Sequence, residues 1–309
     1  MPVEMLSRVA NALYWMGRYL ERAENLTRCL LVTEELATEI RAFNEKLAQS
    51  EWNDVGAIFP GDVEGASDLE HLRGFLTAAA NPYSVMFSLG KARENARAVR
   101  EALSLEVFVT LNETFRALEA QASGGLGDHA DVRDALTATH RGILAIVGAI
   151  EHTLSRDQGW LFLKLGESLE RVFRTAAILR IKLPGLLVKP PETDIPLYYS
   201  QWRSVLRSLC SLENYRKIYG AHVEPTVAIE FLLFDPHAPR SILFGADAVK
   251  RYLEEIAATR ELTSPARIVG RLHARLTYHD ALPALPLLDE VQAELAKTHD
   301  AIDVLYFGT

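Results

Sequence analysis

The amino-acid sequence predicts an all-α protein, a multi-helix bundle of about 10–12 helices, and three observations support this class. None of the 13 prolines lies between Pro2 and Pro60 or between Pro82 and Pro184, whereas seven lie between Pro184 and Pro239. Proline disrupts helix interiors, so the two gaps have room for long helices and the crowded stretch favours loops and short helices. Apolar residues recur at spacings of three and four near the start of the chain. No segment shows the alternating hydrophobicity and hairpin turns that are typical of strands.

The first segment is predicted to be one long helix from near Ser7 to about Leu47. Its apolar residues form a single stripe with the helical period, which indicates a face that packs against a core. A loop is expected over residues 55–65, where Gly56, Pro60 and Gly61 occur, and a short helix over residues 68–80. The stripe consists of Leu6, Val9, Leu13, Met16, Leu20, Ala23, Thr27 and Leu30.

The remaining helices are predicted from capping residues and from the positions of proline and glycine. Ser84 is a suitable N-cap, and a helix is expected to start at Asp128. Pro225 and Pro265 are suited to the first turn of a helix, with Ser264 as a cap. We expect one domain over residues 1–309, in which residues 1–183 form long, internally repeated helices and residues 184–309 supply a crossover loop and the completing helices. The predicted helices are 84–104, 105–122, 128–155, 157–183, 200–219, 225–234, 241–258, 265–278 and 287–307.

Composition and charge exclude several classes of protein. The chain of 309 residues is 49% apolar and 24% charged, an ordinary globular mixture that excludes a disordered tail or a collagen. A net charge of −8 argues against nucleic-acid binding, which needs a concentrated basic face. The longest apolar run, Gly142–Ile150, is too short to span a bilayer, and the N-terminus does not resemble a secretory signal. The two cysteines, Cys29 and Cys210, do not make a disulfide framework and are expected in the core. Together these features predict a cytoplasmic protein that binds neither nucleic acid nor membrane.

A Gly-x-x-x-Glu element recurs in three of the predicted helices. The three glycines are separated by 73 and 76 residues, and two of the elements also share Leu-Glu-Arg. A weaker copy around Glu213 lacks the glycine. Glycine in a helix interior costs about 1 kcal/mol relative to alanine, so three such positions call for a reason. The elements are Gly17 with Glu21, Gly90 with Glu94, and Gly166 with Glu170.

Residues four apart lie on one face of a helix, so each glycine clears space beside its glutamate. That space could admit a neighbouring helix backbone, a partner side chain or a ligand. Buried carboxylates are costly unless they are paired, so their convergence in a bundle would indicate a polar site. The alternative is a solvated, ion-paired helix face. The predicted catalytic residues are Glu21, Glu94 and Glu170, and the predicted substrate-binding residues are Tyr14, Arg18, Arg22, Asn25, Arg93, Arg97, Arg171 and Glu213.

A metal-dependent enzyme is a weaker alternative. Di-metal bundles of the ferritin type use Glu-x-x-His on two helices, and the sequence contains no such pair. Glu21, Glu94 and Glu170 could together ligate Mg²⁺ or Mn²⁺, because hard cations accept all-oxygen sites. The neighbouring arginines would compete for these carboxylates, so no metal is predicted. No Walker A, Rossmann or Gly-x-Ser-x-Gly pattern occurs.

The N-terminal segment from Met5 to Asn25 closely resembles the opening of the bacterial alpha-E family. The run Leu-Tyr-Trp-Met-Gly-Arg-Tyr-Leu-Glu-Arg-Ala-Glu is long and specific. Further similarity covers nearly the whole chain, at residues 81–84, 92–97, 160–171, 232–236 and 239–241. The resemblance implies an all-helical fold named for its Glu-Arg motif.

The resemblance also implies a setting for the protein. Members of the family typically occur beside, or fused to, a circularly permuted ATP-grasp protein, often with a transglutaminase-like protein nearby. ATP-grasp enzymes usually join a carboxylate to an amine through an acyl phosphate. The resemblance therefore implies a helical component of peptide or amide ligation or peptide modification, with the ATP-grasp partner in trans supplying ATP and Mg²⁺. A non-catalytic scaffold for that partner is the alternative, in which the Glu-Arg elements lock helices together.

Overall fold

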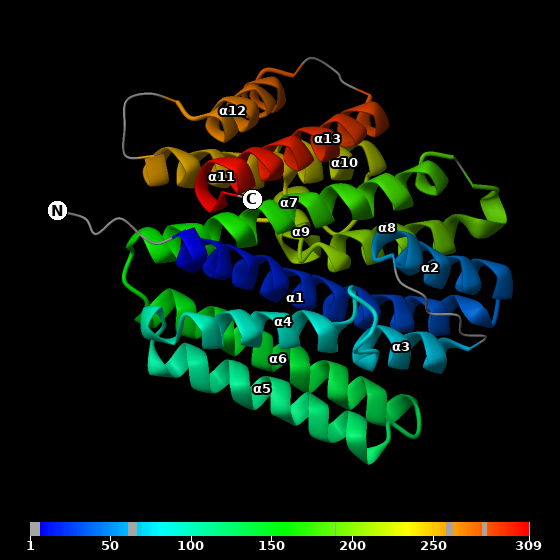
Figure 1. Ribbon diagram of the computed structural model, residues 1–309. Helices are drawn as coiled ribbons and strands as arrows, with labels where there is room; N and C mark the ends of the chain where they lie inside the picture. Colours follow the sequence, from blue (N-terminus) through cyan, green and yellow to red (C-terminus); the bar gives the residue numbers. More distant parts are fainter. Residues whose placement is uncertain (1–6, 61–66, 189, 258–261, 280–282, 309) are drawn as a thin grey trace. The chain divides into compact units, whose positions relative to one another are not determined.

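The computed structural model describes residues 7–60, 67–188, 190–257, 262–279 and 283–308. Over these residues the chain forms 13 α-helices and three short helical segments and contains no strand, so the predicted all-α class is confirmed (Figure 1). The chain divides into two compact units. Unit 1 comprises residues 1–34, 59–167 and 306–308, and unit 2 comprises residues 35–58, 168–305 and 309.

Unit 1 contains the first part of α1, helices α3–α6 and the start of α7. Helices α5 and α6 pack closely against each other, α4 packs against α5, and α3 contacts both α4 and α6. Figure 1 shows α4, α5 and α6 running side by side along α1. The helices of this unit are α1 (Ser7–Arg41, as far as residue 34), α3 (Asp68–Thr77), α4 (Val85–Ala98), η1 (Arg100–Ala102), α5 (Leu105–Gly124), α6 (His129–Thr153) and the start of α7 (Gln158–Leu186).

Unit 2 contains the end of α1, most of α7 and the C-terminal helices. Helix α12 contacts both α11 and α13, α10 contacts α11, and α8 contacts α9. The helices that lie wholly or largely in this unit are α2 (Glu45–Ile58), η2 (Glu192–Asp194), α8 (Ile195–Ser208), α9 (Leu212–Tyr219), α10 (Pro225–Phe234), α11 (Ile242–Ala257), α12 (Ser264–Thr277), α13 (Ala284–Ile302) and the π-helical segment η3 (Asp303–Phe307).

Helix α1 is buried on more than one face. The predicted apolar stripe is buried from Leu13 to Leu30, Val9 is half-buried, and Leu6 lies outside the described residues. Charged and amide side chains of the same helix are also buried, although charged residues seldom are unless they are paired. The helix therefore places polar groups inside the protein as well as apolar ones. These groups are Arg18, Glu21, Glu24, Asn25, Arg28 and Glu34.

Local capping explains where several helices begin. The Ser84 hydroxyl accepts a hydrogen bond from the Phe87 amide at 3.0 Å, and the Asp128 carboxylate accepts one from the Asp131 amide at 3.0 Å. The predicted N-cap Ser84 is confirmed, and Asp128, where a helix was expected to start, caps that helix, because these side chains satisfy amides that the first turn leaves open. The expected cap Ser264 is wrong, since it is already the first residue of α12.

The N-terminal helix ends earlier than predicted. Helix α1 stops at Arg41, and a separate helix, α2, covers residues 45–58, although residues 55–58 were expected to belong to a loop. The Asn44 side chain accepts a hydrogen bond from the Leu47 amide at 3.0 Å and so begins α2. Gly56 misled the prediction, because it lies within a helix that buries Trp52, Val55 and Ile58.

Two boundaries around the proline-rich stretch also differ from the prediction. Helix α7 continues through Pro184 to Leu186, although proline has no N–H to donate to the carbonyl one turn earlier. The single helix expected over residues 200–219 is two helices, which break at Leu209–Ser211. Cys210 has a positive φ of 49° there and is exposed, so its expected place in the core is wrong. The fold does not show the expected internal pseudo-repeats.

Candidate functional site

Two of the three recurrent glycines lie where α1 and α7 cross within unit 1. A Cβ on Gly17 would overlap the carbonyl oxygen of Leu163 and lie 3.0 Å from the amide nitrogen of Glu167. A Cβ on Gly166 would overlap the carbonyl oxygen of Tyr14 and lie 2.9 Å from its carbonyl carbon. Each glycine therefore packs against the backbone of the other helix. Of the three occupants considered for the cleared space, a neighbouring helix backbone is the one found here.

The third glycine has a different environment. A Cβ on Gly90 of α4 would approach only the ring of Phe115, at 3.4 Å, which is an ordinary contact. The glycines of the recurrent motif therefore differ in whether their surroundings leave room for a side chain. Gly17 and Gly166 permit a close helix crossing, whereas Gly90 does not require the absence of a side chain.

Glu21 is buried in unit 1 and is held by its own helix. Its Oε1 accepts a hydrogen bond from the side-chain amide of Asn25, one turn later, at 2.9 Å. Tyr14 and Arg18 are also buried, and the Arg18 guanidinium lies 4.9 Å from the ring centre of Trp15 and 5.9 Å from that of Tyr14. Four predicted site residues, Tyr14, Arg18, Glu21 and Asn25, therefore lie inside unit 1 along successive turns of α1.

Arg22 lies at an aromatic surface in the same unit. It is half-buried, and its guanidinium lies 5.3 Å from the ring centre of Tyr19 and 5.6 Å from that of Tyr83. Cation–π contacts of this kind contribute about 0.5–1 kcal/mol at exposed sites. Tyr83 belongs to the Asn-Pro-Tyr-Ser turn that precedes α4, so Arg22 joins two stretches on which the family resemblance depends.

The predicted residues on α4 lie at the surface of unit 1. The Glu94 side chain is 65% exposed and is bound by Lys91 at 2.8 Å. Arg97 is exposed, whereas Arg93 is half-buried and donates to the side-chain oxygen of Asn112 at 2.7 Å. Arg93 thus connects α4 to α5 rather than facing Glu94.

Glu170 lies in unit 2 and is fully buried. Its Oε1 accepts a hydrogen bond from Arg174 at 2.9 Å, and Arg174 also donates to the carbonyl oxygen of Ile58 at 3.0 Å. Arg171 is half-buried. Glu213 is 83% exposed and pairs with Arg216 at 3.2 Å.

The proposed convergence of Glu21, Glu94 and Glu170 stays a prediction. Glu21 and Glu94 belong to unit 1, and Glu170 and Glu213 belong to unit 2. Within each unit, one predicted glutamate is buried and paired while the other faces solvent. The repeated sequence element therefore does not give its glutamates equivalent surroundings.

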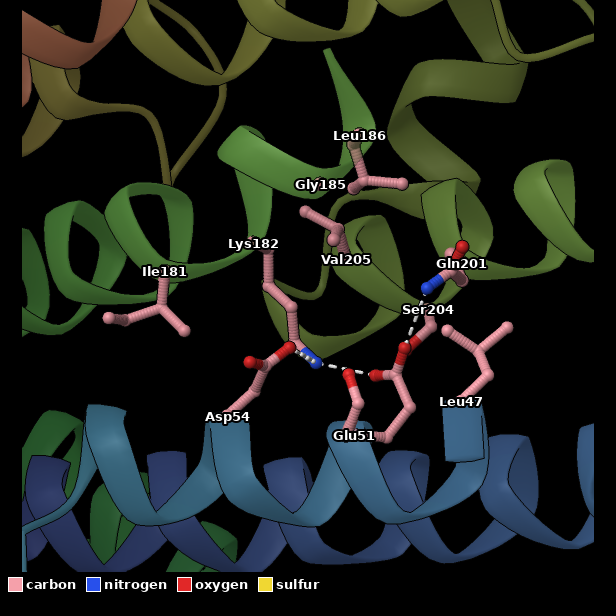
Figure 2. Close-up of a pocket in the computed structure, with 11 residues that line it drawn as sticks. Leu47, Glu51, Asp54, Ile181, Lys182, Gly185, Leu186, Gln201, Ser204 and Val205 are labelled. Carbon is pink, nitrogen blue, oxygen red and sulfur yellow. Dashed lines mark hydrogen bonds and ion pairs between the residues drawn. The ribbon is translucent and has the colours of Figure 1, made fainter. Parts of the chain in front are cut away.

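Unit 2 contains a cavity of about 230 Å³ with an ionic cluster in its wall. Lys182 of α7 extends between two carboxylates of α2, with its Nζ 2.5 Å from Oε2 of Glu51 and 2.8 Å from Oδ2 of Asp54 (Figure 2). Gln201 of α8 donates to Oε1 of Glu51 at 2.8 Å. Three helices thus contribute to one polar wall, and the remaining lining residues are Leu47, Ser50, Ile181, Gly185, Leu186, Ser204 and Val205.

Burial and charge act against each other in this cluster. Burial alone would lower the pKa of Lys182, but the carboxylates of Glu51 and Asp54 raise it overall, so the ammonium keeps its proton. Burial raises the pKa of Asp54, and the charge of Lys182 offsets only part of that effect. Both oxygens of Glu51 have donors, and Glu51 is only 2% exposed. In this cluster Glu51 has a donor on each oxygen, burial disfavours the charged form of Asp54, and the protonated Lys182 lies between the two carboxylates.

Several oxygen atoms in the wall of the cavity have no protein partner among the residues that the structure describes. They are Oδ1 of Asp54 and the hydroxyl oxygens of Ser50 and Ser204. Ser204 is only 7% exposed as a whole residue, and it lines the cavity. All three oxygens can accept hydrogen bonds, so they are suited to a ligand that donates them.

Sequence reasoning did not single out these residues. The carboxylates of α2 are separated from Lys182 by 131 and 128 positions and from Gln201 by up to 150, so no local motif joins them. Part of α2 was predicted to be a loop. The one available signal was a lysine between Ile181 and Leu183 in an apolar helix, since a lysine there needs a partner.

Two further classes of site are not seen in the described part of the chain. No group of three or more histidine, cysteine, aspartate or glutamate side chains is arranged to hold a metal ion. No helix combines the length and apolar character needed to cross a bilayer.

Comparison with known proteins places the chain in a family. A family model described as a predicted alpha-helical domain with a conserved ER motif matches residues 5–307. The chain belongs to the Alpha-E family. Glu21-Arg22 and Glu170-Arg171 are its two Glu-Arg pairs within Leu-Glu-Arg, and they follow the two glycines of the helix crossing. The resemblance inferred from the sequence is confirmed.

Relatives of this Alpha-E chain carry no functional name. Uncharacterized proteins of Mycobacterium bovis and of two Mycobacterium tuberculosis strains are 26–27% identical to it over 312 aligned positions. The alignments cover 94% of this chain but 34% of each relative, so the chain spans about a third of their length. No solved structure matches the chain.

Proposed function

We propose that this Alpha-E protein is the helical, substrate-binding component of an ATP-grasp-linked system that makes or modifies peptide or amide bonds. Membership of the family supports this setting, and the resemblance described above supplies the expected partner, a circularly permuted ATP-grasp protein in trans. A transglutaminase-like protein is a further expected associate. ATP and Mg²⁺ enter through the ATP-grasp partner.

The reaction assigns separate tasks to the two proteins. A carboxylate takes the terminal phosphoryl group of ATP and gives an acyl phosphate and ADP. An amine then attacks the acyl carbon, an amide forms, inorganic phosphate leaves and the amine loses a proton. The ATP-grasp partner performs the activation, and the Alpha-E chain binds a substrate or intermediate.

The observation that carries this proposal is the cavity of unit 2. It combines space for a small ligand with charged and hydroxyl groups from three helices, as binding sites for small molecules do. Glu21 and Glu170, the buried members of the predicted site, already have partners in Asn25 and Arg174. We therefore assign substrate binding to the cavity and retain the Glu/Arg pocket as the alternative site.

The test is reconstitution of the activity with the ATP-grasp protein that we expect to be encoded beside this chain. The two proteins are co-purified, and ATP-dependent condensation is followed by phosphate release and by mass spectrometry of the product. Asp54→Asn should lower turnover at least about tenfold while co-purification is retained, since it changes a cavity wall without removing a partner from Glu51. The matched control is Asp289→Asn, an exposed carboxylate in the same unit that pairs with Arg180. Equal turnover of the two variants contradicts the proposal.

The scaffold alternative has a specific observation in its favour. Gly17 and Gly166 permit a close crossing of α1 and α7, which is a structural use of the recurrent element. If Glu21→Gln and Glu170→Gln lose stability without a specific loss of turnover, the elements are interhelix locks. Folded but inactive variants would instead favour the Glu/Arg pocket as the site.

A further inference from the structure

We infer that the cavity of unit 2 binds the primary ammonium group of a small aliphatic amine. This is the cavity to which substrate binding is assigned above, so the ligand class rests on the proposed function. The argument for an amine depends on the charge, the hydrogen-bonding groups and the apolar lining of the cavity.

The wall of the cavity already binds one ammonium group. Lys182 Nζ lies 2.5 Å from a Glu51 oxygen and 2.8 Å from an Asp54 oxygen, so both carboxylates are placed to accept from a primary ammonium. Ammonium–carboxylate hydrogen bonds are among the stronger ones in proteins. A second ammonium that approached the open oxygen of Asp54 would meet the same chemistry.

The charge of the cluster favours a cation over an anion. Glu51 and Asp54 contribute two negative charges and Lys182 one positive charge, so the cluster carries a net charge of −1. Lys182 already donates to both carboxylates, so its ammonium is not available to neutralise an anionic ligand. The net negative charge of the cluster would repel such a ligand. A cation would balance the remaining charge, and buried charges are tolerated when they are paired.

The free hydrogen-bonding atoms match a donor ligand. Oδ1 of Asp54 and the hydroxyl oxygens of Ser50 and Ser204 can all accept hydrogen bonds, and a primary ammonium offers three donors. The cluster supplies acceptors for the ammonium without any rearrangement of Lys182.

The rest of the lining suits an aliphatic chain. Leu47, Ile181, Leu186 and Val205 surround the polar wall. The cavity measures about 230 Å³. A dry cavity of about 150 Å³ can hold benzene, so this one has room for a chain of about four or five carbons. We therefore expect n-butylamine to represent the ligand class, as a free amine or as the amino end of a larger substrate.

Isothermal titration calorimetry on the full chain tests this directly. The probes are n-butylamine, n-butanol and butyrate, which share a chain and differ in charge. Butylamine should bind at least about tenfold more tightly than either of the others. Equal affinity for butylamine and butanol, tighter binding of butyrate, or no detectable binding of butylamine would each overturn the inference.

Variants locate the binding. Asp54→Asn should weaken butylamine binding at least about tenfold, whereas Asp289→Asn should leave it unchanged. If Asp54→Asn does not fold, as judged by circular dichroism, Ser204→Leu decides, because the larger side chain fills the cavity and should abolish binding. If folded Asp54→Asn binds butylamine as tightly as the unmodified chain, or if folded Ser204→Leu still binds it, the inference is overturned.

The calorimetry needs no ATP-grasp partner, so the two failures are distinguishable. Amine binding without reconstituted condensation would contradict the proposed function and leave the amine site intact. ATP-dependent condensation by a chain that does not bind butylamine would contradict the amine site and leave the proposed function intact.

Discussion

Gly17 of α1 and Gly166 of α7 occupy reciprocal positions in one helix crossing, where each would strike the other helix's backbone if it carried a Cβ. The atoms in the way are the carbonyl oxygens of Leu163 and Tyr14. A backbone carbonyl in a helix cannot move aside as a flexible side chain can, because it is part of the hydrogen-bond ladder. The close crossing therefore depends on glycine at both positions.

Alanine at either position should destabilise the protein. We expect Gly17→Ala and Gly166→Ala each to lower the free energy of unfolding by about 1–3 kcal/mol, the usual cost of overpacking, or more. Urea denaturation measures the change. The control is Gly148→Ala in α6, where a Cβ meets nothing within 4 Å. It should raise stability by up to about 1 kcal/mol through helix propensity. A destabilised Gly148→Ala would show that the cost is not specific to the crossing.

The same substitution at Gly90 tests whether the third recurrent element has the structural role of the other two. Gly90→Ala should be neutral or stabilising by up to about 1 kcal/mol, since its Cβ would make an ordinary contact with the Phe115 ring. Urea denaturation again gives the comparison. A loss as large as that of Gly17→Ala would mean that all three elements serve one structural purpose.

Removal of the buried ammonium should be costly. Lys182→Met leaves Glu51 and Asp54 without their shared cation, and we expect the free energy of unfolding to fall by about 3–5 kcal/mol. The triple variant Glu51→Gln, Asp54→Asn, Lys182→Met removes all the charges and should recover much of that loss. If the triple variant is no more stable than Lys182→Met, the unpaired carboxylates are not the cause of the stability loss in Lys182→Met.

Replacing a predicted site glutamate by glutamine should reduce stability much more where the glutamate is buried than where it is exposed. Glu170→Gln should lower the free energy of unfolding by about 2–4 kcal/mol, because it weakens a charged hydrogen bond to Arg174 inside the protein. Glu94→Gln and Glu213→Gln should change stability by less than about 0.5 kcal/mol, since exposed ion pairs contribute little. Chemical denaturation of the three single variants checks this, and equal losses would contradict the different surroundings described for them.

Burial of His71 in α3 predicts a pH dependence of stability. Burial lowers the pKa of His71 below its usual value, and Asp68 and Glu70 offset only part of the effect. Between the lowered pKa and about 6.5 the unfolded chain binds more protons than the folded one, so stability rises with pH in that window and falls on acidification below about 6.5. The slope, measured by urea denaturation from pH 5 to 7, should be smaller in His71→Gln. His152→Gln, at an exposed position, should retain the original slope; if His71→Gln also retains it, another group is responsible.

The amino-acid sequence determined the helical class and much of the local structure. Helix α10 has the predicted bounds, Ser84 caps the helix that it was expected to cap, and α6 begins directly after Asp128, where a helix was expected to start. These features depend on contacts between residues close in the chain, which periodicity and capping preferences report. The segment from Met5 to Asn25 also sufficed to indicate the family.

Only the tertiary structure decided what the recurrent elements and the charged residues do. The motif gave Gly17, Gly90 and Gly166 the same local pattern, but the helix opposite each glycine fixes whether a Cβ fits. The cavity joins Glu51 to Lys182 and Gln201, which lie 131 and 150 positions away. Burial and pairing of charges are properties of what packs alongside a residue, and for these residues the neighbours come from distant parts of the chain.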